Sequence, residues 1–337
     1  MTSPDRSALR PEITEFLEEL DAAGGSFAEL APDEVRPVVE ELCRQLWGER
    51  VAVLTVADIE VPGSGAQIPA RIYAPQSPGP HPGVVFFHGG GWVIGSINTH
   101  DGACRRLAEL LGCLVVSVQY RKAPEFQFPI PLEDAWEATK WVFSNAARLD
   151  IDPARISVVG ESAGGNLAAV VARRARDHGL SLNSQVLVYP VTDSVTDNGS
   201  YEKNATGFNL TKEQMEWFIG HYARGPEDLV DPDFSPLRAS DLRGMAPAYI
   251  LTVEADPLHD EGVAYAAALS SAGVDVTHED LTDVVHGFFI MNAITPATDE
   301  TIRRVADYLK AMWSRQPSSA ATLINSSSDD TSSSPTG

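Results

Sequence analysis

The sequence predicts an α/β fold in which a mostly parallel, doubly wound central sheet carries a helical cap. Short apolar runs typical of strands alternate with helical stretches along most of the chain, which is the order that parallel sheets with right-handed crossovers produce. The run Gly-Val-Val-Phe-Phe at 83–87 is apolar throughout, as expected of a strand buried on both faces. At 337 residues, the chain is long enough for one large domain with an accessory part.

Three segments flank or interrupt the predicted sheet. Residues 1–48 contain two amphipathic helical stretches and no strand, so we expect them to form one part of a cap. Residues 49–315 form the main, catalytic domain, and an insertion at about 192–238 is expected to supply the second part of the cap. The Ser-rich tail, 316–337, has almost no large apolar residue and is expected to be disordered.

Hydrophobic periodicity places the individual elements along the chain. The predicted strands are 51–59, 68–73, 83–87, 114–118, 155–159, 185–189, 248–253 and 274–278. The predicted helices are 11–20, a stretch that follows Pro32 and Asp33, 101–111, 132–148, 166–172, 211–222 and 261–272.

Composition limits the kinds of partner and the compartment. The formal net charge of −22 argues against nucleic acid and anionic membrane surfaces and favours a small neutral substrate. Cys43, Cys104 and Cys113 show neither an even count nor metal-ligand spacing, so we expect reduced, mostly buried thiols. The first residues contain no apolar signal core, and no apolar run reaches membrane-spanning length. We therefore expect a cytoplasmic protein without membrane insertion.

The pattern Gly-x-Ser-x-Gly occurs at 160–164, directly after a predicted strand and directly before a predicted helix. By itself this pattern is also compatible with a glycine- and serine-rich loop that has no chemistry. Because the pattern lies between a predicted strand and a predicted helix, it predicts a sharp turn from which the hydroxyl of Ser162 projects. The N-terminus of the following helix would then point backbone N–H groups at charge that develops beside the serine.

Three consecutive glycines follow the buried strand 83–87, within His88-Gly89-Gly90-Gly91-Trp92. A flexible turn is the simpler interpretation, but so many glycines are entropically costly and indicate a close approach of the backbone to another group. We predict an oxyanion hole made by the N–H groups of Gly90, Gly91 and Ala163, with Gly89 shaping the loop. His88 precedes the serine motif and is expected to shape the same loop.

An acid and a base follow the last two predicted strands. Asp256 comes just after the strand 248–253, and Asp260 fits the cap of the next helix better than Asp256 does. His286 follows the last strand, although a single histidine is usually structural or solvated. The chain order Ser162, Asp256, His286 matches a known order of catalytic triads. We predict that His286 takes the proton of Ser162 and that Asp256 orients the imidazole.

Two further expectations concern the surroundings of these motifs. Arg121 and Glu125 are expected to pair and to brace the loop under the glycine segment. Five aromatic residues are candidates for an apolar pocket wall, although each could equally be ordinary core: Trp92, Tyr189, Trp217, Phe218 and Phe288.

Together the motifs resemble those of the bacterial hormone-sensitive-lipase-like carboxylesterases. The resemblance covers about residues 10–315 and rests on His88-Gly89-Gly90-Gly91-Trp92, Tyr120-Arg121 with Ala123-Pro124-Glu125, Gly160-Glu161-Ser162-Ala163-Gly164-Gly165, Asp256-Pro257-Leu258 with Asp260-Glu261-Gly262, and His286-Gly287-Phe288. It implies an α/β-hydrolase fold with a helical cap built from the N-terminus and an insertion. The chain departs from the family's usual residues at Glu161, His259, Leu281 and Asp283.

We therefore expect a serine carboxylesterase that hydrolyses short-chain carboxylic esters through an acyl-enzyme on Ser162, with no metal or organic cofactor. The sequence leaves a homodimer open. One alternative is a ligand-binding protein on the same fold, as in the plant gibberellin receptors, which lack a working histidine; the intact His286 argues against it. Another alternative is a different reaction in the same site, such as dehydration or lactone opening.

Overall fold

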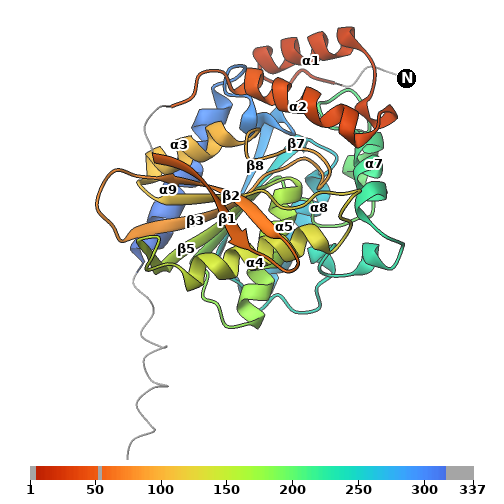
Figure 1. Ribbon diagram of the computed structural model, residues 1–337. Helices are drawn as coiled ribbons and strands as arrows, with labels where there is room; N and C mark the ends of the chain where they lie inside the picture. Colours follow the sequence, from red (N-terminus) through yellow and green to blue (C-terminus); the bar gives the residue numbers. More distant parts are fainter. Residues whose placement is uncertain (1–4, 52–54, 316–337) are drawn as a thin grey trace, which may run out of the picture.

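The computed structural model describes residues 5–51 and 55–315, so the predicted disorder of the tail lies outside the described residues (Figure 1). An eight-stranded sheet with the order β1-β2-β4-β3-β5-β6-β7-β8 forms the centre. Its strands are β1 (Thr55–Pro62), β2 (Gln67–Ala74), β3 (His81–Phe87), β4 (Leu114–Val118), β5 (Ile151–Glu161), β6 (Ser184–Val188), β7 (Ala248–Ala255) and β8 (Val276–Val285). The β1–β2 and β2–β4 pairs are antiparallel and the other pairs are parallel, which confirms the mostly parallel sheet.

Helices cover both faces of the sheet, as the apolar run at 83–87 predicts. Val84 and Phe86 point to one face, and Val85 and Phe87 point to the other, because side chains alternate along a strand. The first face packs against α3 (Asp101–Leu111) and α9 (Ala297–Ser314), and the second against α4 (Ile130–Ser144), α5 (Ala163–Asp177) and α8 (His259–Ser271). The sheet is therefore doubly wound.

Two segments far apart in the sequence meet beside the sheet. The first holds α1 (Pro11–Ala23) and α2 (Pro32–Trp47), and the second holds α6 (Gly199–Lys203) and α7 (Lys212–Tyr222). Figure 1 shows α1 and α2 together at one end of the molecule with α7 next to them. Phe27, in the short turn between α1 and α2, contacts the rings of Trp217 and Phe218 at centroid distances of 5.6 and 5.5 Å.

The element boundaries differ from the predicted ones where pairing extends a strand. The last strand was expected at 274–278, but β8 continues through Val285 because its pairing with β7 continues to the partners Ala255 and Val285. Residues 276–283 of this edge strand are a mixture of half-buried and exposed side chains, so their apolar signal is weak. The extension matters for the site, because it delivers the next residue, His286, to the end of the sheet.

The three cysteines are free and buried, as the sequence predicts. Cys43 lies on α2, and burial raises the pKa of its thiol to about 12. Among the described helices, none combines the length and the apolar character needed to cross a membrane.

Candidate active site

Ser162 lies in the turn between β5 and α5, with a positive φ of 56°. The turn is tight on both sides of the serine. A Cβ on Gly160 would overlap the carbonyl of Gly164, and a Cβ on Gly164 would overlap the carbonyl of Phe87. The N–H of Ser162 donates to the carbonyl of Val188 on β6 at 2.9 Å. The glycines therefore permit the sharp strand-to-helix turn that presents the hydroxyl at the carboxyl end of the sheet.

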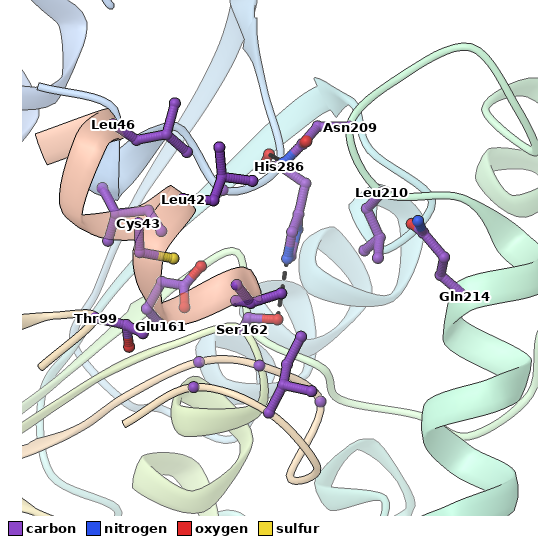
Figure 2. A pocket seen from close by; sticks show the side chains of 18 of the residues that line it. Leu42, Cys43, Leu46, Thr99, Glu161, Ser162, Asn209, Leu210, Gln214 and His286 are labelled. Atoms are coloured by element: carbon purple, nitrogen blue, oxygen red, sulfur yellow. Dashed lines mark hydrogen bonds between the residues drawn. The ribbon is translucent and has the colours of Figure 1, made fainter. Parts of the chain in front are cut away.

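The structure brings Ser162, Asp256 and His286 together at the ends of β5, β7 and β8. His286 Nε2 lies 2.9 Å from Ser162 Oγ, the contact dashed in Figure 2. His286 Nδ1 lies 2.6 Å from Asp256 Oδ2. The other carboxylate oxygen of Asp256 accepts the N–H of Leu258 at 2.9 Å. The carboxylate is completely buried, so its negative charge acts on the imidazole with little screening by water.

The environment of His286 favours its protonated form. Burial by itself lowers the pKa of the imidazole, but the charge and hydrogen bond of Asp256 and the charge of Glu161 outweigh burial. The pKa of His286 is therefore raised above its ordinary value of 6.5. A base with a raised pKa holds a proton more firmly once it has taken it from a hydroxyl.

The glycine loop after β3 passes close to other groups. Gly90 and Gly91 have φ values of 111° and 57°. A Cβ on Gly90 would overlap the carbonyl of Ile94, and a Cβ on Gly91 would overlap the ring of Phe218. Glycine is therefore required here both for the backbone conformation and for the close packing of α7 on the loop.

The N–H groups of this loop fall into two kinds. Gly89 donates its N–H to His100 Nε2 at 3.3 Å. The N–H groups of Gly90 and Gly91 have no acceptor within the described part of the chain. Ala163 is the first residue of α5, where a helix leaves its N–H groups without intrahelical acceptors. Gly90 and Gly91 line the cavity that contains Ser162, and Ala163 is the residue directly after the serine.

His88 shapes the loop. Its ring stacks on Tyr120 at a centroid distance of 4.2 Å, and its Nδ1 lies 2.8 Å from the carbonyl oxygen of Gly89. The hydroxyl of Tyr120 donates to the carbonyl of His88 at 2.8 Å. Burial lowers the pKa of His88 well below 6.5, so the ring is neutral and fixed.

A cavity of about 220 Å³ opens over Ser162 and His286. Figure 2 shows that Cys43, which belongs to α2, lies with Thr99 and Glu161 on one side of Ser162, and that Leu210 and Gln214 lie on the other side. The apolar walls of the cavity come from the helical segments, the loop after β3 and the last loop. They comprise Leu20, Phe27, Val39, Leu42, Leu46, Ile94, Leu210, Met215, Phe218, Ile290 and Met291. An apolar cavity that contains a few polar groups suits a small neutral ligand.

The aromatic pocket candidates were wrong except for one. Among the described residues, Phe218 borders the cavity and the other four candidates do not. Trp92 and Phe288 are fully buried in the core, and Trp217 packs on Phe27. Tyr189 is fully buried, with its ring centroid 4.5 Å from that of His286. Large rings bury most area when they pack between layers, so they filled the interior.

Sequence reasoning missed the aliphatic side of the pocket. Val39, Leu42, Cys43 and Leu46 line the cavity from α2. Their helical spacing was visible in the sequence, but periodicity shows only that a face is apolar and not what covers it.

Two predicted side-chain roles are corrected. Arg121 pairs with Asp134 on α4, with Nη2 2.7 Å from Oδ1. Glu125 pairs instead with Arg36 of α2 at 2.7 Å, because α2 comes within reach of the loop. Asp260 does not cap α8, which begins one residue earlier, at His259.

Asp260 instead accepts the N–H of Ser200, in the first turn of α6, at 2.9 Å. Two of the residues at which the chain departs from the family pattern, His259 and Asp283, also take part in polar contacts. His259 lies 3.1 Å from both Asp260 and Asp280, and Asp283 accepts from Arg10 Nε at 2.8 Å.

Comparison with known proteins agrees with this geometry. A family model described as "alpha/beta hydrolase fold" matches residues 84–290, which is more than half of the chain. An ethyl acetate hydrolase from Pseudomonas putida is 36% identical over 90% of this chain and 99% of its own length. The carboxylesterase NlhH from Mycobacterium tuberculosis is 41% identical over 72% of this chain and 78% of its own length.

Solved structures give the same result. A thermostable esterase from Pseudomonas putida ECU1011 superposes with a TM-score of 0.89 and 33% identity, covering 93% of this chain and 100% of the other. The chain belongs to the α/β-hydrolase family, in its hormone-sensitive-lipase-like carboxylesterase branch. The predicted fold and the predicted class, a carboxylic ester hydrolase, are confirmed.

Proposed function

We propose that this protein hydrolyses short-chain carboxylic esters through an acyl-enzyme on Ser162. The observation that carries the proposal is the hydrogen-bonded series Ser162, His286 and Asp256. Ser162 and His286 line a cavity that also has free backbone N–H groups. A serine hydroxyl is a weak nucleophile unless an adjacent base takes its proton, and this series supplies the base and a group that orients it.

The reaction proceeds in two halves. His286 Nε2 takes the proton of Ser162 as Oγ attacks the ester carbonyl, and Asp256 stabilises the imidazolium that forms. The N–H groups of Gly90, Gly91 and Ala163 donate to the tetrahedral oxyanion. The alcohol leaves with the proton from His286, and water then attacks the acyl-enzyme with His286 again as base. These steps need no metal or organic cofactor.

The cavity supports a short acyl chain and a neutral substrate. Residues 1–48 and the insertion at 192–238 act as a cap over the domain 49–315, because α1, α2 and α7 contribute most of the apolar walls above Ser162. The name of the relative that hydrolyses ethyl acetate agrees with an ester of this size.

The net charge of −22 supports a protein that does not bind nucleic acid. The three free, buried cysteines support a reducing compartment, the cytoplasm. Size-exclusion chromatography with light scattering distinguishes a monomer from the homodimer that the sequence leaves open.

The test is the loss of hydrolysis in Ser162→Ala and His286→Ala. Each variant should lose several orders of magnitude in kcat on p-nitrophenyl butyrate while its circular dichroism stays that of the wild type, because the members of such a series act as a unit. Ser117→Ala is the matched control, since Ser117 is buried on β4 and does not line the cavity. Mass spectrometry of the wild type quenched during turnover should find the acyl group on Ser162.

Retention of a tenth of the wild-type rate in Ser162→Ala, with contamination excluded, would remove Ser162 as the nucleophile. No hydrolysis of any ester by the wild type would favour the receptor or a different reaction.

A further inference from the structure

A second buried carboxylate lies next to the nucleophile and has no role in the mechanism above. Glu161 is the last residue of β5, is 4% exposed and lines the cavity. Its Oε2 lies 3.2 Å from His100 Nε2. A Cβ on Gly89 would overlap this same oxygen, so the carboxylate presses directly on the glycine loop. Figure 2 shows Glu161 beside Ser162 on the α2 side of the cavity.

His100 links this carboxylate to the backbone of the glycine loop. The Gly89 N–H points at His100 Nε2, which is also the atom that faces Glu161. The far nitrogen of the ring, Nδ1, lies 2.8 Å from the hydroxyl of Thr99. That hydroxyl in turn lies 2.8 Å from the carbonyl oxygen of Ser96. Because the Thr99 hydroxyl donates to Ser96, it accepts the Nδ1–H of His100. Nε2 then accepts the Gly89 N–H when the ring is neutral and donates to Glu161 when the ring is an imidazolium. In both forms the ring lies against Gly89, the residue before the two glycines with free N–H groups.

Burial of Glu161 needs a compensating partner. An isolated buried carboxylate costs several kcal/mol and would normally take up a proton. Burial does raise the pKa of Glu161, but the hydrogen bond and charge of His100, with the charge of His286, lower it overall. The carboxylate is thus ionised beside the base.

The other titratable groups near Glu161 stay neutral. Burial raises the pKa of the Cys43 thiol to about 12 and the pKa values of the Tyr120 and Tyr189 hydroxyls well above 10. Among the groups of the described chain that act on Glu161, His100 and His286 are the possible cations, and the Tyr189 hydroxyl is a neutral hydrogen-bond donor that also lowers the pKa of the carboxyl.

We propose that Glu161 and His100 are a positioning pair, which holds the glycine loop in register for the oxyanion and stabilises the imidazolium of His286 during turnover. The proposal rests on the proposed function, because both effects matter only if Ser162 attacks a carbonyl. The contact with Gly89 sets the position of the N–H donors. The negative charge favours the cation that forms on His286 in the transition state, when stabilisation accelerates the reaction.

Substitutions separate the charge of Glu161 from its contact with the loop. Glu161→Gln keeps the shape and the packing on Gly89 but removes the charge. Its kcat on p-nitrophenyl butyrate should fall by about 10- to 100-fold, less than the ~10²–10³-fold that loss of a direct oxyanion donor costs. KM should change by less than about threefold, since the effect is confined to the transition state. The acid limb of the pH profile of kcat/KM should move to lower pH, because His286 loses a neighbouring anion.

Glu161→Asp keeps the charge but withdraws the carboxylate from Gly89. It should lower kcat and leave the acid limb close to its wild-type position. His100→Gln removes the partner and should also lower kcat, and its combination with Glu161→Gln should cost less than the two single losses added together. Glu133→Gln is the control: Glu133 pairs with Arg174 outside the cavity, so its rate and pH profile should match the wild type.

Two results would overturn the proposal. One is wild-type kcat and pH profile in Glu161→Gln. The other is a loss of kcat in parallel with the melting temperature while the acid limb stays in place, which would mean that the carboxylate only fills space. If Glu161→Gln does not fold, the same measurements on His100→Gln test the proposal. A wild-type kcat in His100→Gln would then overturn it. Failure of the proposed function is distinct, because it would appear as activity in Ser162→Ala.

Discussion

Truncation of Leu210 to alanine should shift the enzyme's acyl-chain preference toward longer esters. Leu210 precedes α7, is 7% exposed and lines the cavity. Figure 2 shows it beside His286, on the side opposite α2. Its side chain therefore occupies space next to the reacting carbonyl, and its removal should enlarge the cavity where the substrate binds.

The size of the effect follows from the cavity volume. A cavity of about 220 Å³ holds roughly seven non-hydrogen atoms at ~30 Å³ for each. Each methylene that fits should add about 0.8 kcal/mol, or about fourfold in kcat/KM. Each methylene beyond the limit has to displace side chains at a cost of about 1–3 kcal/mol. The wild type should therefore peak at about four to six acyl carbons and fall steeply by about twelve.

In Leu210→Ala, the lost side chain makes room for about two more methylenes, so the optimum should move by about two carbons. The free energy of unfolding should decrease by about 2–5 kcal/mol, as in other buried leucine truncations. Leu242→Ala is the matched control, because Leu242 is 6% exposed and does not line the cavity. It should lose comparable stability and keep the wild-type preference.

The assay is kcat/KM on p-nitrophenyl esters of increasing acyl length, below the concentration at which each substrate aggregates. An unchanged optimum in Leu210→Ala would show that this wall does not limit chain length. A wild-type profile that still rises at about twelve to sixteen carbons, with faster rates above the aggregation threshold, would indicate a true lipase and refute the volume argument.

Three further predictions test the base, the turn and the tail. Because His286 accepts a proton only when neutral and its pKa is raised, kcat/KM should fall as the pH drops through a midpoint above 6.5; a midpoint below 6.5 in a pH-rate profile would contradict this. Gly164→Ala should lower the free energy of unfolding by about 1–3 kcal/mol, because its Cβ would overlap the carbonyl of Phe87, whereas Gly220→Ala, where a Cβ meets open space, should not. Deletion of 317–337 should leave the melting temperature and kcat nearly unchanged, since the composition of this segment offers little apolar surface to bury; a clear drop in melting temperature would show that it docks.

Local patterns in the sequence were enough to predict the strands and most of the helices in their order, although the short α6 and the C-terminal α9 were not predicted. Strand and helix periodicities arise within a few residues, from the alternation of side chains along a strand and the spacing of apolar positions on a helix. The same local information marks the turn at Ser162, because only glycine tolerates the close approaches on either side of it. The order of Ser162, Asp256 and His286 along strand ends was readable too, since parallel strands deliver their carboxyl ends to one edge.

Only the tertiary structure decided which side chains meet across the layers. Arg121 pairs with Asp134 and not with Glu125, because Glu125 pairs with Arg36 from α2. Glu161 meets His100 across 61 positions of sequence, so neither residue indicates the other locally.

The walls of the cavity were decided in the same way. An apolar helix face in the sequence indicates that another part of the protein covers that face. Which side chains form the cavity walls depends on how α2 and α7 dock over Ser162. Hydrophobic burial is non-directional, and many pairings of apolar faces satisfy it. The sequence by itself therefore determined the fold class and which groups are the candidates for the reaction. The substrate cavity and the surroundings of the reacting groups were determined by long-range packing, which fits the whole chain together.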